Sequence, residues 1–296
     1  MHDILNEIGQ KGSEGAPHDF VRQKHLKALA DETGRDTILY AADLSAGYNV
    51  GSNFINEEDI LAFKTATEEL NSRELDLILH SPGGFGDAAE QIVNFLRSRY
   101  EHIRAIIPQT AMSAATMIAC AADEILMGDY SALGPTDVQI GPGISAQHVL
   151  SEFELAKEEM AKDPRSRFPW SIRLNSIPQG YLEACSKQME LARTLVSQWL
   201  EKYMFKDTPQ AKARADHIAT WLANAEIHKS HSRPLAIGDL VEQGLKVRNL
   251  KETPNLEEKV FNTFTATVIC FDRSPYTKIT ENHKGKVLYA MPRQGS

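Results

Sequence analysis

The segment from Arg104 to Gly128 constrains the fold more than any other part of the chain. Its apolar residues predict a buried strand over Ile103–Ile107, a helix of small residues, and a second strand over Glu124–Met127. Ser113 stands at the mouth of the helix, where free backbone N–H groups and the helix dipole can stabilise an oxyanion. Serine is also a common N-cap residue, so this segment alone leaves a structural and a catalytic interpretation open.

Two further strand–helix pairs precede this segment. Buried strands are predicted over Thr37–Ala42 and Leu75–Leu79, and amphipathic helices over Asn56–Leu70 and Asp87–Tyr100. The alternation of strands and helices predicts an α/β fold of repeated βαβ units, with a mostly parallel sheet flanked by helices. The chain has 296 residues, of which 42% are hydrophobic, enough for one large domain or two small ones.

The second predicted strand ends in a glycine turn, Pro82-Gly83-Gly84. Proline fixes one backbone dihedral and glycine adopts positive φ at no steric cost, so such a turn can direct a backbone N–H outward. An oxyanion hole needs two converging N–H donors. One from this turn and the N–H that follows Ser113 would supply them, although an ordinary tight strand–helix turn is the alternative.

Charge and composition exclude several classes of function. The net charge is −8 and the pI is about 5.7, so no general affinity for nucleic acid or an anionic membrane is expected. The longest apolar run, from Ala111 to Ala122, is shorter than a membrane span needs, and the acidic N-terminus is not typical of a signal peptide. We therefore expect a cytoplasmic protein with no membrane span.

Cysteine and histidine give little support for a metal site. The cysteines lack the spacing of metal ligands, so we expect buried free thiols in a reducing compartment. They are Cys120, Cys185 and Cys270. His217, His228 and His231 form a weak pattern, which a polar helix end explains more often than a metal does. The nucleotide-binding motif G-x-x-x-x-G-K-[ST] is absent from the sequence, and we expect no metal and no other cofactor.

Three motifs follow one another along the chain: H-S-P-G-G-F-G-D-A-A-E-Q-I, A-M-S-A-A-T-M-I-A-C-A-A-D-E-I-L-M and A-L-G-P-T-D-V-Q-I-G. Their order and separation resemble the serine dehydrogenase proteinase family. The resemblance is strong over Gly34–Gly141 and continues weakly over Leu182–Met204 and His231–Val247. It implies the Clp/crotonase fold, in which repeated β-β-α units form a mostly parallel sheet flanked by helices. The family shares this fold with signal peptide peptidase A and the Clp protease proteolytic subunit.

The resemblance also implies roles for individual residues. Ser113 matches the nucleophile, and the N–H groups of Gly84 and Ala114 match the oxyanion hole. Gly83 would shape the turn, and Gly134-Pro135-Thr136-Asp137 would be the turn beside the site. Members of this fold usually assemble into rings or stacked trimers, so the resemblance implies a homo-oligomer.

The motifs determine the general base least well. Clp-type proteases carry a histidine downstream of the serine, where this sequence has Val138-Gln139, whereas the membrane-peptidase branch uses a lysine. Lys187 lies where the related proteases carry theirs, and it can act only if burial or a nearby cation lowers its pKa. Lys187 lies opposite the main apolar seam of its predicted helix, so a solvated lysine is the alternative. A second apolar strip lies beside Lys187, which favours a helix that is covered on both sides. Lys157 and Lys162, in a charged run, are further candidates.

The remaining segments have less distinct patterns. Residues 142–180 contain several prolines and are predicted to be irregular, either lining a substrate groove or disordered. The stretch Thr263–Phe271 alternates like a strand, and Lys286–Ala290 is a second candidate strand. We therefore divide the chain into an N-terminal helical extension (1–36), a catalytic domain (37–250) and a C-terminal β-rich extension (251–296).

Together these features predict a serine peptidase. A Ser113–Lys187 dyad would cleave a peptide or protein substrate through an acyl-enzyme, and any unfolding ATPase would be a separate partner. One alternative is a crotonase-like acyl-CoA hydratase or thioesterase, which uses the same two-amide hole on a thioester. The other is an inactive scaffold that binds peptides.

Overall fold

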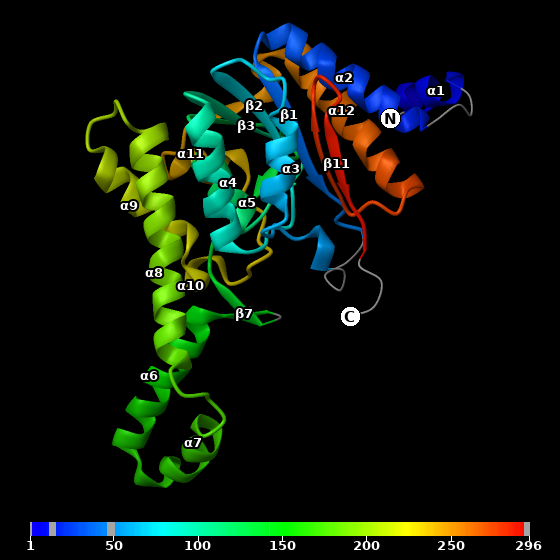
Figure 1. The fold of residues 1–296 in the computed structure, drawn as a ribbon. Helices are drawn as coiled ribbons and strands as arrows, with labels where there is room; N and C mark the ends of the chain where they lie inside the picture. The colour runs from blue at the N-terminus through cyan, green and yellow to red at the C-terminus, as the bar shows by residue number, and fades with distance from the viewer. Residues whose placement is uncertain (1, 12–15, 46–50, 142, 293–296) are drawn as a thin grey trace.

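A computed structural model describes residues 2–11, 16–45, 51–141 and 143–292. A seven-stranded sheet forms its centre, with strand order β11-β10-β1-β2-β3-β5-β9 (Figure 1). Five neighbouring strands run parallel to one another. They are β1 (Asp36–Ala42), β2 (Glu74–His80), β3 (His102–Ile107), β5 (Glu124–Met127) and β9 (Val247–Asn249). The predicted α/β fold with a mostly parallel sheet is therefore confirmed.

Helices α3 (Asp59–Ala66), α4 (Gly86–Arg99) and α5 (Ala114–Cys120) connect the parallel strands and cover one face of the sheet. Every residue of α5 is buried. Its small side chains let the helix lie close to the sheet, which fixes the position of the residue that precedes it.

The chain termini together cover the other face of the sheet. Helix α2 (Pro17–Thr33) packs along α12 (Pro254–Arg273), and α1 (His2–Gln10) contacts both (Figure 1). Strands β10 (Lys278–Asn282) and β11 (Val287–Ala290) then extend the central sheet, because β10 pairs antiparallel with β1. The strand expected near Lys286–Ala290 is present.

The strand predicted over Thr263–Phe271 is wrong, since this stretch lies within helix α12. The alternating threonines suggested a strand, but nearly all side chains of this half of the helix are buried. A helix buried on most sides loses the polar face that marks a helical period. The hydroxyls of Thr263 and Thr267 donate to backbone carbonyls four residues earlier, which satisfies them inside the helix.

The irregular segment predicted over 142–180 is also wrong for most of its described residues. Helices α6 (Ala146–Lys162) and α7 (Arg167–Leu174) form a helical arm with the start of α8 (Tyr181–Trp199), and the arm projects from the sheet (Figure 1). Pro164 opens a short 3-10 turn after α6, so this proline starts a helical turn. Toward its C-terminal end α8 returns to the body, where Ala192, Leu195 and Val196 join the core.

Shorter elements complete the fold. A π-helical turn (Leu200–Met204) extends α8 and precedes α9 (Ala211–Leu222), α10 (Ala225–His228) and α11 (Ile237–Glu242). Two small ladders lie outside the main sheet, one of β4 (Thr110–Ala111) with β6 (Ala132–Leu133) and one of β7 (Gln139–Gly141) with β8 (Ile144–Ser145). The remaining 3-10 turns are Gly51–Asn53 and Leu250–Glu252.

The length of the helices and the burial of the cysteines can be compared with the expectations from the sequence. In the part of the chain that the structure describes, no helix combines the length and apolarity that a membrane crossing requires. All three cysteines are buried and free, and burial raises the pKa of the Cys120 thiol to about 12.

Candidate active site

Ser113 connects β4 to helix α5 in a strained conformation. Its φ is 52° and its ψ is −118°, in a region that non-glycine residues rarely occupy. Such strain is typical of nucleophiles held on a sharp strand-to-helix turn. Ser113 occupies the N-cap position, yet its side chain makes no capping hydrogen bond. The capping interpretation of this serine therefore does not account for its hydroxyl group.

The glycine turn lies directly against this serine. A Cβ on Gly83 would lie 2.7 Å from both the Met112 carbonyl oxygen and the Ser113 Cβ. A Cβ on Gly84 would lie 2.8 Å from the Cα of Ile55 on the other side. Both positions therefore require glycine, and φ is positive at each. The structure thus brings Gly83, Gly84 and Ser113 together.

Two backbone N–H groups beside Ser113 are available. The Ile55 N–H donates to the Gly83 carbonyl at 2.8 Å and the Phe85 N–H donates to the Ile55 carbonyl at 2.9 Å. Because alternate residues of an extended segment bond to opposite sides, the Gly84 N–H is directed away from Ile55. The Ala114 N–H opens helix α5 and has no partner within the helix. Across the described ranges, neither N–H donates to another protein group.

A buried threonine holds the neighbouring turn in place. The Thr116 hydroxyl accepts from the Gly134 N–H at 3.0 Å and lies 2.8 Å from the Ala111 carbonyl, to which it can donate. Gly134 also packs on Met112, where a Cβ would lie 2.8 Å from the sulfur. The Gly134-Pro135-Thr136-Asp137 turn is therefore fixed next to the residue that precedes Ser113.

The glycine turn is also held from the side of strand β2. The Ser81 hydroxyl accepts from the Gly83 N–H at 3.2 Å. His80 is buried and packs edge-on against Phe264 of helix α12. Burial lowers the pKa of His80 to about 4, so this imidazole is neutral at physiological pH.

The three lysines predicted as candidate bases all lie at the surface. Each pairs with a glutamate of its own helix, at distances between 2.7 and 3.3 Å. The pairs are Lys187–Glu183, Lys157–Glu154 and Lys162–Glu158. The Lys187 side chain is 70% exposed, so the single chain does not bury it. Its role as base stays a prediction.

Sequence reasoning missed an imidazole–carboxylate pair beside the site. His231 Nδ1 lies 2.7 Å from Asp137 Oδ1, and only 4% of the Asp137 side chain is exposed. The signal was the motif H-S-R-P-L, which was used only as a weak part of the resemblance. The other two histidines of the proposed metal pattern have separate partners, since His217 bonds Gln243 and His228 bonds the Trp221 carbonyl.

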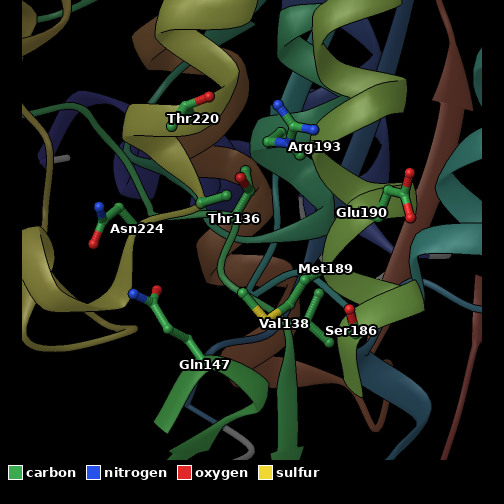
Figure 2. Close-up of a pocket in the computed structure, with 10 residues that line it drawn as sticks. Thr136, Val138, Gln147, Ser186, Met189, Glu190, Arg193, Thr220 and Asn224 are labelled. Atoms are coloured by element: carbon green, nitrogen blue, oxygen red, sulfur yellow. The ribbon is translucent and has the colours of Figure 1, made fainter. Parts of the chain in front are cut away.

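Two hollows lie near the candidate site. One, of about 280 Å³, is lined by Pro82, Met112, Ser232 and Pro234 among other residues. The other, of about 450 Å³, lies between α8, α9 and the turn, with Thr136 and Val138 on its wall (Figure 2). The wall of the first includes Met112, the residue that precedes Ser113, and Pro82 of the glycine turn.

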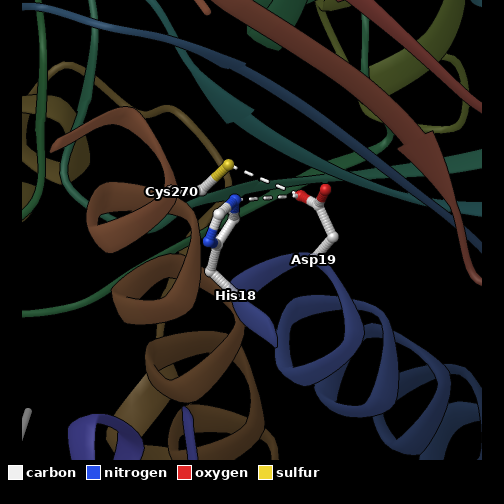
Figure 3. Close-up of side chains that lie close together, drawn as sticks. All are labelled: His18, Asp19 and Cys270. Atoms are coloured by element: carbon white, nitrogen blue, oxygen red, sulfur yellow. Dashed lines mark hydrogen bonds and ion pairs between the residues drawn. The ribbon is translucent and has the colours of Figure 1, made fainter. Parts of the chain in front are cut away.

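Among the described residues, His18, Asp19 and Cys270 lie close enough to share a metal ion (Figure 3). They join helices α2 and α12 on the face of the sheet opposite Ser113. Asp19 Oδ1 already accepts from the Arg22 guanidinium at 2.7 Å, and burial raises the pKa of the Cys270 thiol to about 11. Arg22 thus neutralises the carboxylate and the sulfur is held as a thiol, which suits a helix contact better than a cation site.

Comparison with known proteins gives a match to a protein family. A family model described as ClpP-like SDH-type serine proteinase matches residues 53–265. Uncharacterized protein MJ0137 of Methanocaldococcus jannaschii is 42% identical over 86 residues, which are 29% of each chain. Uncharacterized protein MJ1495 of the same organism is 29% identical over 206 residues, 70% of this chain and 60% of that one. The chain thus spans less than two thirds of the length of either relative.

Two solved structures are more distant. A mutant of the 1510-N membrane-bound stomatin-specific protease has 15% identity and a TM-score of 0.39, over 70% of this chain and 79% of that chain. A ClpP1 mutant from Listeria monocytogenes has 14% identity and a TM-score of 0.37, over 77% and 99%. The family match, by contrast, covers the whole candidate site and most of the chain. This chain therefore belongs to the ClpP-like SDH-type serine proteinase family.

Proposed function

We propose that this chain is a serine peptidase in which Ser113 attacks the carbonyl carbon of a peptide bond. The observation that supports this most is the uncapped hydroxyl of Ser113 beside two available N–H donors, those of Gly84 and Ala114. The oxyanion of a tetrahedral intermediate needs two such donors in fixed positions. Membership of a serine proteinase family agrees with this chemistry.

The proposed reaction proceeds through an acyl-enzyme. The Ser113 Oγ–C bond forms while a base takes the hydroxyl proton, and the carbonyl electron pair moves to the oxygen between the two N–H groups. Collapse of this intermediate breaks the C–N bond, and the amine leaves with the proton from the base. Water then attacks the acyl-enzyme, which releases the carboxylic acid product and regenerates the serine.

The predicted Ser113–Lys187 dyad would depend on assembly. Lys187 and Leu191 lie one helical turn apart on the same exposed side of α8, and Leu191 is 50% exposed. A neighbouring subunit that covers this side would bury both residues, which a lysine needs in order to act as a base. The homo-oligomer implied by the fold, trimer-based or a ring, would provide such a subunit.

A fluorophosphonate probe tests the proposal. We expect the wild-type protein to gain one adduct, mapped by mass spectrometry to the peptide that contains Ser113. Ser113→Ala abolishes the adduct and peptidase activity, whereas Ser98→Ala, at an exposed serine of α4, leaves both unchanged. Labelling that persists in Ser113→Ala contradicts the proposal. Acyl-CoA turnover that survives in Ser113→Ala would favour the crotonase-like alternative.

A further inference from the structure

We propose that His231, oriented by Asp137, is the general base that takes the proton from Ser113. This inference rests on the proposed peptidase function and replaces Lys187 as its base. The pair has the arrangement in which a buried carboxylate holds an imidazole through Nδ1 and leaves Nε2 to act on a hydroxyl.

The backbone sets this pair in place. Leu133 and Leu235 form an antiparallel bridge in which each N–H donates to the other's carbonyl, at 3.1 and 2.8 Å. Asp137 and His231 are each four residues from this bridge, on the two segments that it joins. Their side chains meet at a distance of 2.7 Å between His231 Nδ1 and Asp137 Oδ1.

Leu133 also connects this bridge to the segment that leads to Ser113. Ala111 pairs in parallel with Leu133, so the chain runs from Ala111 into Ser113 beside the run from Leu133 toward Asp137. Met112, next to the nucleophile, and Ser232, next to the imidazole, line one hollow of about 280 Å³. The chain neighbours of the candidate base and of the candidate nucleophile therefore line the same small space.

The hydrogen bonds of the pair suit a base. Asp137 Oδ2 accepts from the Gln139 side-chain amide at 2.7 Å, so both carboxylate oxygens are held. A carboxylate is an acceptor only, which places the imidazole proton on His231 Nδ1. Nε2 then carries a lone pair, and it bonds to no protein group within the described ranges. His231 is 25% exposed, so substrate and water can reach it, in contrast to a fully buried structural histidine.

The proton balance needs no other group. His231 Nε2 accepts the Ser113 proton, directly or through one water, as the Oγ–C bond forms. The imidazolium beside Asp137 then gives this proton to the leaving amine as the C–N bond breaks. In the second half-reaction Nε2 accepts a proton from the attacking water and returns it to Ser113 Oγ.

The test compares acylation rates with an activated ester and a fluorophosphonate in four variants. His231→Ala should acylate about 10²–10⁴-fold more slowly than wild type. Added imidazole should restore part of that rate, which a merely structural role of His231 would not allow. His217→Ala, at an exposed histidine of α9, should stay within about twofold of wild type. Lys187→Met distinguishes the two candidate bases, because only a lysine base would make this variant slow. Asp137→Asn should lower the rate because it no longer fixes the imidazole.

Two results overturn the inference. Wild-type acylation in a folded His231→Ala protein, together with loss in Lys187→Met, would return the role to the lysine and leave the peptidase proposal intact. Absence of any adduct in the wild-type protein would remove the proposed function and this inference with it. If His231→Ala does not fold by circular dichroism, His231→Gln replaces it, and acylation at the wild-type rate would again overturn the inference.

Discussion

A buried ion pair far from Ser113 in sequence should control the glycine turn. Lys278, from strand β10, donates to both oxygens of Asp59, at 2.6 and 2.8 Å, and each side chain is at most 5% exposed. Lys278 also donates to the Phe54 carbonyl at 2.9 Å, and Asp59 accepts from the Asn56 N–H at 2.9 Å. The pair thus holds both neighbours of Ile55, the residue that bonds the glycine turn.

Asp59→Asn should reveal this dependence. Burial lowers the pKa of Lys278, whereas the Asp59 carboxylate raises it, so removal of the negative charge leaves an ammonium group buried without its counter-ion. Loss of one partner of a buried pair costs about 3–5 kcal/mol. We expect that loss in the free energy of unfolding, and slower acylation of Ser113 because the segment behind Gly84 loosens.

Urea unfolding at pH 7 and fluorophosphonate labelling measure the two effects. The matched control is Lys286→Met, which removes a more exposed pair with Glu69 (3.0 Å) and should leave the stability close to that of wild type. The double variant Asp59→Asn/Lys278→Met should recover part of the stability, because no charge is then buried alone. An Asp59→Asn protein within 1 kcal/mol of wild type would refute the reasoning on stability. Unchanged labelling would refute the link to the turn.

Two further predictions concern the residues around the turn. Gly84→Ala forces a Cβ against the Ile55 backbone and displaces an oxyanion donor, so the rate of Ser113 acylation should fall about 10²–10³-fold. Gly86→Ala has open space around its Cβ and should leave the rate unchanged. Equal rates in both variants would contradict this prediction. His80 has a pKa of about 4 in the folded protein and an ordinary pKa in the unfolded chain. Between these two values only the unfolded chain binds the proton, so the free energy of unfolding decreases as the pH is lowered through this range. Between pH 7 and pH 5, His80 should lower the free energy of unfolding by about 2 kcal/mol. Urea unfolding of wild type and His80→Gln at both pH values should show that the variant does not have this loss of stability.

Local sequence patterns were sufficient for β1, β2, β3, β5 and β11 of the central sheet, whereas β9 and β10 were not predicted. The strands β1 and β2 are apolar because α/β packing buries them on both faces, and this pattern does not depend on distant residues. Helix α12 was missed because its threonines mimic strand alternation while their hydroxyls are satisfied within the helix. The α6–α7 arm was missed because its helices bury few residues, which leaves little apolar periodicity to detect.

The candidate site also has a part that local sequence patterns predict and a part that they do not. Ser113 and the glycine turn were predicted because a helix mouth and a Pro-Gly-Gly turn are local features. The Asp137–His231 contact joins residues 94 positions apart, on segments that the Leu133–Leu235 bridge brings together, and no local pattern encodes that bridge. The Lys278–Asp59 pair was missed for the same reason, since it spans 219 positions.

The most direct test of the central claim is a crystal structure of the fluorophosphonate adduct. The account predicts phosphorus bonded to Ser113 Oγ, with the phosphonyl oxygen about 2.7–3.1 Å from the N–H nitrogens of both Gly84 and Ala114. An adduct on another residue, or an oxygen that points to solvent while both N–H groups stay unused, would contradict it.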